Sequence, residues 1–307
     1  MIPPRAAVLH VFFGSDVGNL QDLIQFIFAG LTGGAIYALV ALGFGVVHNT
    51  MGIVNFTQVD FVSLGGMVLY SALFAAGLPM PAALAAAILG VTLAALVVEE
   101  LGVRPSRSQS HLVLIFLTIG LSIILRGLMK LVWGKNRLAV PSLSGDTPLH
   151  LLGASILPQT LWILGLTALA IVLLMLFFRR TNLGLAMRAV ATNEAAAAVV
   201  GLRVWRVKAA SFALAGALGG LAGCLVTPIT TLSYDVGVLL GLKGFAAAIL
   251  GGFGSFPGAI LGGLILGLLE SLGAAYISSA YKDVIAFVVL LLVLFIRPRG
   301  LLGGAGS

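Results

Sequence analysis

The sequence predicts an all-α fold, a polytopic transmembrane helical bundle of about eight spans that includes broken or re-entrant helices. Of the 307 residues, 60% are hydrophobic and only 9% are charged, whereas about 25% of the residues in a typical soluble domain are charged. Apolar segments of about 20 residues recur along the chain, and an α-helix needs this length to cross a hydrocarbon core of ~30 Å. Such a chain cannot bury its apolar surface inside a water-soluble globule.

Six segments have the length and composition of a membrane span: residues 23–47, 61–77, 81–101, 112–133, 160–178 and 209–230. Residues 241–270 are equally apolar but are interrupted by GSFPG at 254–258, which predicts either two short helices or a re-entrant hairpin. A last span is expected near residues 284–296. The apolar run at 6–13 lacks a signal-peptide cleavage pattern and is interpreted as a retained interfacial segment.

The distribution of basic residues predicts the orientation of these spans. The loop at 179–208 carries six basic residues and one acid, and further arginines occur at 102–111 and after residue 296. Because loops rich in Lys and Arg remain in the cytoplasm, the N-terminus and the loop at 134–158 are expected outside and the C-terminus inside. The same bias accounts for the net charge of +7, so nucleic acid is not expected as a partner.

The sequence shows no recognisable catalytic, metal-binding or nucleotide-binding motif. The four histidines lack the spacing of metal ligands, and the single cysteine, Cys224, lies in an apolar run, where a thiol is usually a core residue. A phosphate-binding loop requires Gly-Lys-Ser/Thr, but the Gly134-Lys135 pair is followed by Asn136. We therefore expect no enzymatic activity, no metal and no cofactor, and any ATP must be used by another chain.

Polar residues interrupt the apolar sequence between the first two spans. Asn55, Thr57, Gln58 and Asp60 occur in HNTMGIVNFTQVDFVSLGG, which is too short for an aqueous loop. Bare polar groups at membrane depth are costly, so these side chains must face protein or water. One interpretation is a broken helix that lines a translocation pathway. The other is a cytoplasmic turn in which Asn55 caps the next helix.

Other charged residues are expected at the ends of spans. Glu99 and Glu100 precede two arginines and predict an ion-pair cluster at the cytoplasmic interface. Glu270, Arg126 and Lys130 lie near predicted outer ends, where they can pair or extend to water.

A short capped helix is expected inside the basic loop. Thr192 or Asn193 can cap it, Glu194 is favourable at its N-terminus, and Gly201 suits its C-terminal turn. Its alanines leave a smooth surface that would fit a groove of a cytoplasmic partner. The alternatives are a solvated loop helix or a helix resting on anionic lipid.

The segment TNLGLAMRAVATNEAAAAVVGLRVWRVKAASFALAGALGGLAG resembles the coupling region of permease subunits from branched-chain amino acid ABC importers. Within it, Glu194-Ala195-Ala196 with Gly201 resembles the EAA loop of ABC permeases. GLTGGAIYALVALGFGVVHNTMGIVNF resembles the first helix and following break of that family, and GLKGFAAAILGGFGSFPGAILGGLILGLLE with IRPRGLLG resembles its C-terminal third. The resemblance covers nearly the whole chain.

The resemblance implies a single transmembrane permease domain over residues 1–307, with a cytoplasmic coupling loop at 179–208. It implies a bacterial inner-membrane importer with a second permease subunit, expected to be a different chain, two cytoplasmic ATPase subunits and an external solute-binding protein. The residues expected to couple the chain to the ATPases are Arg188, Asn193, Glu194, Ala195, Ala196, Gly201 and Arg203.

Branched-chain amino acids are the leading substrates that the resemblance implies, and urea, short amides, other amino acids and aromatic or alicyclic carboxylates are the alternatives. The chain departs from the family where NFTQVDF has Val59 and Asp60 in place of the usual Gly and Glu, and this bears on the substrate. A rival class is an ATP-independent carrier or channel, which would use intramembrane charged residues for coupling.

Overall fold

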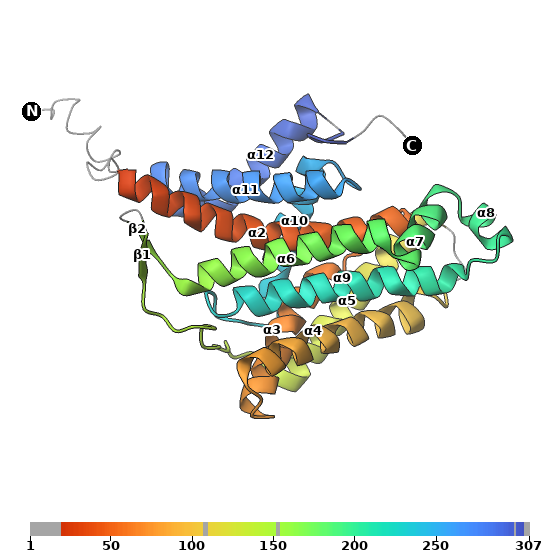
Figure 1. Ribbon diagram of the computed structural model, residues 1–307, viewed down its shortest axis with the longest axis horizontal. Helices are drawn as coiled ribbons and strands as arrows, with labels where there is room; N and C mark the ends of the chain where they lie inside the picture. Colours follow the sequence, from red (N-terminus) through yellow and green to blue (C-terminus); the bar gives the residue numbers. More distant parts are fainter. Residues whose placement is uncertain (1–19, 107–109, 152–153, 298, 304–307) are drawn as a thin grey trace, which may run out of the picture.

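The computed structural model describes residues 20–106, 110–151, 154–297 and 299–303, which form a bundle of long helices lying side by side (Figure 1). Its principal helices are α2 (Leu20–Met51), α3 (Gln58–Phe74), α4 (Met80–Val97), α5 (His111–Trp133), α6 (Pro158–Arg180), α9 (Val204–Val226), α10 (Val236–Gly251), α11 (Phe256–Tyr276) and α12 (Lys282–Ile296). In the described residues, 7 helical segments are long and apolar enough to span a membrane, and α3 and α10 are shorter apolar helices. The predicted polytopic bundle is confirmed.

The interrupted C-terminal region consists of two separate helices. α10 ends at Gly251 and α11 begins at Phe256, with Pro257 in its first turn and the Ser255 hydroxyl accepting a hydrogen bond from the N–H of Gly258 at 3.1 Å. Proline suits the first helical turn because the N–H it lacks has no partner there. Residues 241–270 thus form two helices separated by a break, and α11 is long enough to cross a membrane whereas α10 is shorter.

Shorter elements connect the principal helices. The π-helix η1 (Val98–Val103) continues α4, and the 3₁₀ turn η2 (Ser279–Tyr281) precedes α12. The strands β1 (Leu149–Leu151) and β2 (Ala154–Ile156) form an antiparallel hairpin, and α7 (Asn182–Thr192) precedes the predicted short helix, α8 (Glu194–Val199). The sequence did not predict the hairpin or α7. The expected interfacial segment at 6–13 lies outside the described residues.

The bundle has two distinct ends, which we call the α8 end and the hairpin end (Figure 1). At the α8 end, the Nδ2 of Asn49 in α2 donates to the carbonyl of Gly254 between α10 and α11. The N–H of Leu301 in the C-terminal segment donates to the carbonyl of Leu250 nearby. The Arg104 guanidinium lies 4.3 Å from the centre of the Trp205 ring at the start of α9. The three basic segments of the sequence therefore gather at one end.

Glycines let α2 and α11 pack backbone against backbone along the middle of the bundle. A Cβ at Gly34 would lie 2.8 Å from the Leu264 Cα, and one at Gly267 would lie 2.3 Å from the Gly34 nitrogen. Gly30 and Gly34, like Gly263 and Gly267, are four residues apart, which is the spacing that allows close helix packing in membranes. The α2 and α11 helices are thus closely packed against each other.

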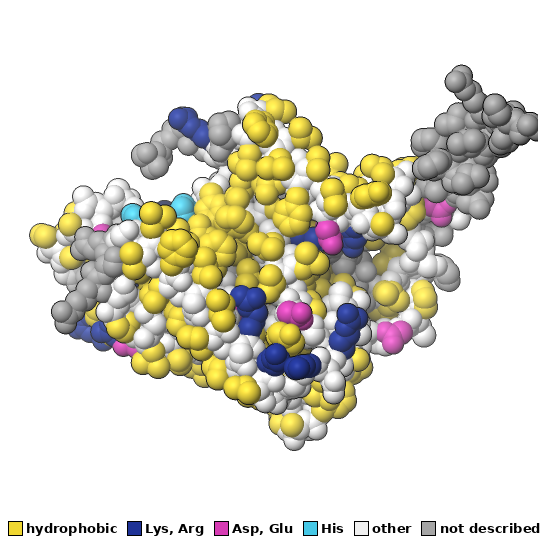
Figure 2. Space-filling view, turned by 180° about the vertical axis from the view of Figure 1, so that it is seen from behind, with side chains coloured by type: hydrophobic (Ala, Val, Ile, Leu, Met, Phe, Trp, Pro, Cys, Tyr) yellow, Lys and Arg dark blue, Asp and Glu magenta, His cyan; other side chains and the backbone are white. Residues whose placement is uncertain are grey.

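The outer helices expose apolar side chains. Leu131 of α5 is 83% exposed and Phe295 of α12 is 86% exposed. Figure 2 shows a face covered mainly by hydrophobic side chains, with Lys, Arg, Asp and Glu side chains toward its middle. Apolar surface of this extent is buried by lipid or by other subunits.

Candidate translocation and coupling sites

The connection between α2 and α3 enters the bundle. The N–H of Phe56 donates to Thr118 Oγ1 at 3.2 Å, and Thr118 lies in α5, which begins at His111 at the α8 end. At about 1.5 Å per residue, this contact lies roughly 10 Å inside that end of the bundle. Non-helical backbone at such depth in a membrane protein is enclosed by protein or lines a water-filled path.

Asn55 and Thr57 form the turn within this connection. The Asn55 Oδ1 accepts hydrogen bonds from the Thr57 N–H at 3.1 Å and from the Thr57 hydroxyl at 2.6 Å. The α3 N-terminus has no side-chain cap, so Asn55 serves the turn before the helix and not the helix itself. Its Nδ2 is buried and has no hydrogen-bond partner among the described residues.

Gln58 fills a slot between α2 and α9. Its Nε2 donates to the carbonyl of Ala215 at 3.2 Å, and a Cβ at Gly43 would lie only 2.0 Å from this nitrogen. The Oε1 of Gln58 is buried without a hydrogen-bond partner in the described part of the chain. Two glycines, Gly43 and Gly219, therefore provide the space for a polar side chain in the interior.

Asp60 is paired with a basic residue of α5. Its Oδ1 lies 3.2 Å from the Arg126 Nε, and the Arg126 Nη2 donates to the Ser122 hydroxyl at 3.0 Å. Asp60 is 1% exposed, whereas the Arg126 side chain is 31% exposed. The expectation that Arg126 either pairs or extends to water is met by the pair with Asp60.

The structure thus brings Asn55, Thr57, Gln58 and Asp60 together in the interior, each at most 1% exposed. Buried polar atoms without partners are rare, and those of Asn55 and Gln58 need a physical explanation.

The short helix α8 forms as the sequence predicts. The Asn193 Oδ1 accepts a hydrogen bond from the N–H of Ala196 at 2.9 Å, and Gly201 ends the segment with φ of +87°. Lys208 Nζ lies 2.7 Å from Glu194 Oε1, which ties α8 to the start of α9. Only Ala197 of α8 is buried. The helix is therefore held at its ends and inner face, and the rest remains exposed.

All of the predicted coupling residues lie on the exposed surface of α8 and its flanking residues. Arg188, Asn193, Glu194, Ala195, Ala196, Gly201 and Arg203 are all exposed. The sequence interpretation did not include Val199 and Val200, which are 88% and 77% exposed. Two adjacent valines in a basic loop were the sequence signal for this exposed apolar surface, and such surfaces are typical of interaction sites. A cavity of about 860 Å³ separates this segment from the end of α2 and is lined by His48, Asn49, Arg188 and Asn193, among others.

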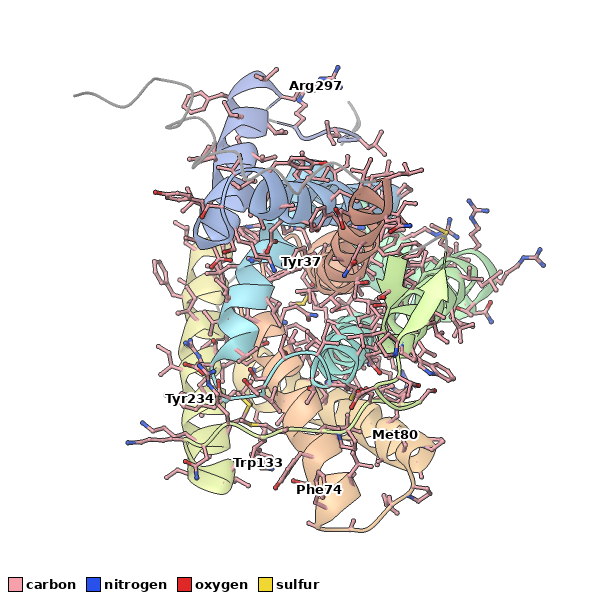
Figure 3. All side chains as sticks on the ribbon, turned by 90° about the vertical axis from the view of Figure 1, so that its left-hand side faces the viewer. Tyr37, Phe74, Met80, Trp133, Tyr234 and Arg297 are labelled. Carbon is pink, nitrogen blue, oxygen red and sulfur yellow. The ribbon has the colours of Figure 1, made fainter. Side chains whose placement is uncertain are left out.

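A second charged site lies around Tyr37, where α2 meets α10, α11 and the start of α12 (Figure 3). Glu270 Oε2 accepts a hydrogen bond from the Tyr37 hydroxyl at 2.8 Å, and Glu270 Oε1 lies 2.7 Å from Lys243 Nζ and 3.3 Å from Lys282 Nζ. Lys243 Nζ also lies 2.5 Å from Asp283 Oδ1. We call these five residues the ion cluster.

The ion cluster was only partly foreseen. Glu270 was expected to pair or to reach water near a helix end, and it pairs while remaining 2% exposed. Lys243 was not identified, although a single lysine in the apolar run of α10 was a sufficient signal, because a charge inside a membrane segment is retained for function or paired.

Glu100 pairs with Arg104 as predicted. Glu99 is buried, and its Oε2 has no hydrogen-bond partner among the described residues.

Comparison with known proteins shows the family of this chain. A family model described as branched-chain amino acid transport system / permease component matches residues 26–294. The high-affinity branched-chain amino acid transport system permease protein LivH of Salmonella typhimurium is 35% identical, covering 91% of this chain and 95% of that protein. BraD of Pseudomonas aeruginosa, with the same description, is 34% identical, covering 92% and 95%. A probable LivH of Methanocaldococcus jannaschii is 28% identical, covering 89% and 91%.

Proposed function

The chain belongs to the family of permease components of branched-chain amino acid transport systems, and on this premise we propose that it carries branched-chain or related amino acids across the bacterial inner membrane. In this proposal the chain forms one half of the pathway of an ABC importer. A second permease subunit, of different sequence, forms the other half. An external binding protein delivers the solute, and two cytoplasmic ATPase subunits supply the energy.

The observation that carries the proposal is the exposed, capped α8. Its position at the end of the bundle, with Val199 and Val200 exposed and Ala197 anchored, fits a helix that docks into a groove of another protein. A six-residue helix has little stability of its own, so the Asn193 cap and the Lys208–Glu194 pair preserve a defined shape for docking. We assign this surface to the ATPase subunits.

The orientation follows from the same segment. With α8 on the cytoplasmic side, the arginines of the α8 end face the cytoplasm, as the positive-inside bias requires. The hairpin end and the N-terminus then face outward, where the binding protein docks, and the C-terminus is cytoplasmic. The buried residues Asn55, Thr57, Gln58 and Asp60 lie between these ends and form polar steps of a pathway that is closed in this conformation.

The test is transport by the assembled complex. The chain is co-purified with its second permease subunit and ATPases, reconstituted in liposomes, and supplied with binding protein and labelled leucine. We expect uptake that requires both ATP and the binding protein, with leucine, isoleucine and valine preferred over urea, acetamide and benzoate. A complex carrying a hydrolysis-deficient ATPase is the matched control. Uptake driven by an ion gradient without ATP would contradict the proposal and favour a secondary carrier.

A further inference from the structure

We propose that the cavity beside the ion cluster is a binding station for a small zwitterionic α-amino acid, with Glu270 receiving its ammonium group and Lys282 its carboxylate. The inference rests on the proposed function, because it assigns a solute site to the same permease. This cavity is distinct from the polar connection at Asn55, and the inference specifies the chemical class of its ligand.

The cavity has the size and position of a solute site. Its volume is about 360 Å³, and its lining includes Phe26, Gly33, Tyr37, Glu270 and Lys282. This volume lies within the range of about 300–1,000 Å³ that is usual for small-molecule sites. The lining comes from the N-terminal half of α2, the C-terminal part of α11 and the start of α12. The cavity is therefore toward the hairpin end, where the solute is delivered.

The charges of the ion cluster balance. Lys243 and Lys282 contribute two positive charges, and Glu270 and Asp283 contribute two negative charges. A zwitterion preserves this balance and provides a partner for each sign. An anionic carboxylate would add an uncompensated charge beside buried groups, which is costly. Urea and simple amides are neutral and leave the net charge unchanged. If they displaced a lysine from Glu270, however, neither charged group would have an ionic partner.

The contacts show which pair the solute replaces. Lys243 is held by two carboxylates, at 2.7 Å and 2.5 Å, and its side chain is only 4% exposed. Lys282 has the longer contact with Glu270, at 3.3 Å, and its side chain is 54% exposed. An incoming ammonium therefore takes the place of the Lys282 ammonium at Glu270 Oε1, and the released lysine turns to the incoming carboxylate. One ion pair is exchanged for two.

The remaining lining contains two serines, Ser271 and Ser279, and is otherwise free of polar side chains, so it can receive an aliphatic side chain. Phe26, Ala29, Ala274 and Ala275 are apolar, and together with Gly33 they leave space beside the charged groups. The Tyr37 hydroxyl, which donates to Glu270 Oε2, fixes the carboxylate so that the second oxygen faces the lysines. A ligand with adjacent opposite charges and a short apolar side chain can therefore occupy both the charged part and the apolar part of the cavity.

Gly33 allows a test that leaves the ion cluster intact. A Cβ at Gly33 would meet only the Tyr37 Cε2, at 3.9 Å, so a side chain added there enters the cavity without a clash. In the complete complex, Gly33→Cys should react with a membrane-impermeant thiol reagent added from outside. Leucine delivered by the binding protein should slow this reaction, and urea or benzoate should not. Background labelling is low because the native Cys224 is buried.

Gly33→Leu should fill the cavity and lower leucine uptake about tenfold or more, while the complex assembles normally. Gly120→Leu is the matched control, because a Cβ at this exposed position on α5 has nothing within 4 Å. Suppose that the unmodified complex transports leucine. Normal uptake by Gly33→Leu, or labelling of Gly33→Cys that leucine does not slow, would then show that the cavity is not a binding site. Loss of transport by the unmodified complex would instead contradict the proposed function.

Discussion

The proposed docking of α8 on an ATPase leads to a quantitative prediction for Val199→Asn. The Val199 side chain is 88% exposed, so it contributes little to the stability of the isolated chain and nearly all of its surface is available to a partner. Burying a valine side chain completely is worth about 1.5–3 kcal/mol. Since 1.4 kcal/mol corresponds to a factor of ten, the substitution should weaken ATPase binding by about 10- to 150-fold.

The assay is a titration of the purified permease pair with the ATPase subunits in detergent, read as a dissociation constant and as ATP hydrolysis stimulated by the loaded binding protein. Thermal unfolding of the permease should not change, because the wild-type valine makes few contacts in the chain. Leu302→Asn is the control, since Leu302 is 45% exposed in the C-terminal segment and lies outside α8. An unchanged dissociation constant for Val199→Asn would refute the docking argument, and an equal loss for Leu302→Asn would show that the effect is not specific to α8.

Three further predictions follow from the packing, the pathway and the orientation. Gly34→Leu should prevent assembly, because its Cβ would lie 2.8 Å from the Leu264 backbone, and retained assembly in a pull-down would contradict the close packing of α2 and α11. Asp60→Asn should reduce uptake while preserving the complex, since it removes the charge that faces Arg126, and normal uptake would exclude a pathway role. Cysteines placed at the exposed Ala198 and Thr147 should react from the cytoplasmic and outer sides respectively, and labelling of both from one side would reject the orientation.

The features that the sequence predicted are those with local causes. The spans follow from the length of apolar segments, and α8 follows from Asn193 and Gly201, whose capping and positive φ involve only residues within the segment. The break before α11 is similarly local, because Pro257 cannot extend α10 but suits the first turn of a new helix. In each case a few neighbouring residues determine the backbone.

The features that could not be predicted depend on which helices are neighbours. Tyr37 and Glu270 are 233 residues apart, and neither residue indicates its partner. Gln58 was recognised as a polar residue in an apolar context, but its slot requires Gly43 and Gly219 from two other helices. A uniformly apolar sequence contains many similar helix faces, so hydrophobic patterning specifies that helices pack but not which faces meet.

The helix α2 joins the two functional ends of the protein. It carries Tyr37, hydrogen-bonded to the ion cluster, and Asn49, whose Nδ2 donates to the Gly254 carbonyl at 2.7 Å beside the cavity under α7 and α8. The two residues are twelve positions apart, which corresponds to about 18 Å along the helix. Because α2 and α11 meet backbone to backbone, no flexible layer of side chains separates them, and we expect the two helices to move together. In the proposed importer, a displacement of α7 and α8 by an ATPase would reach the ion cluster through this helix pair. We expect the partly exposed Lys282–Glu270 contact, at 3.3 Å, to break first, because the Lys282 side chain is 54% exposed.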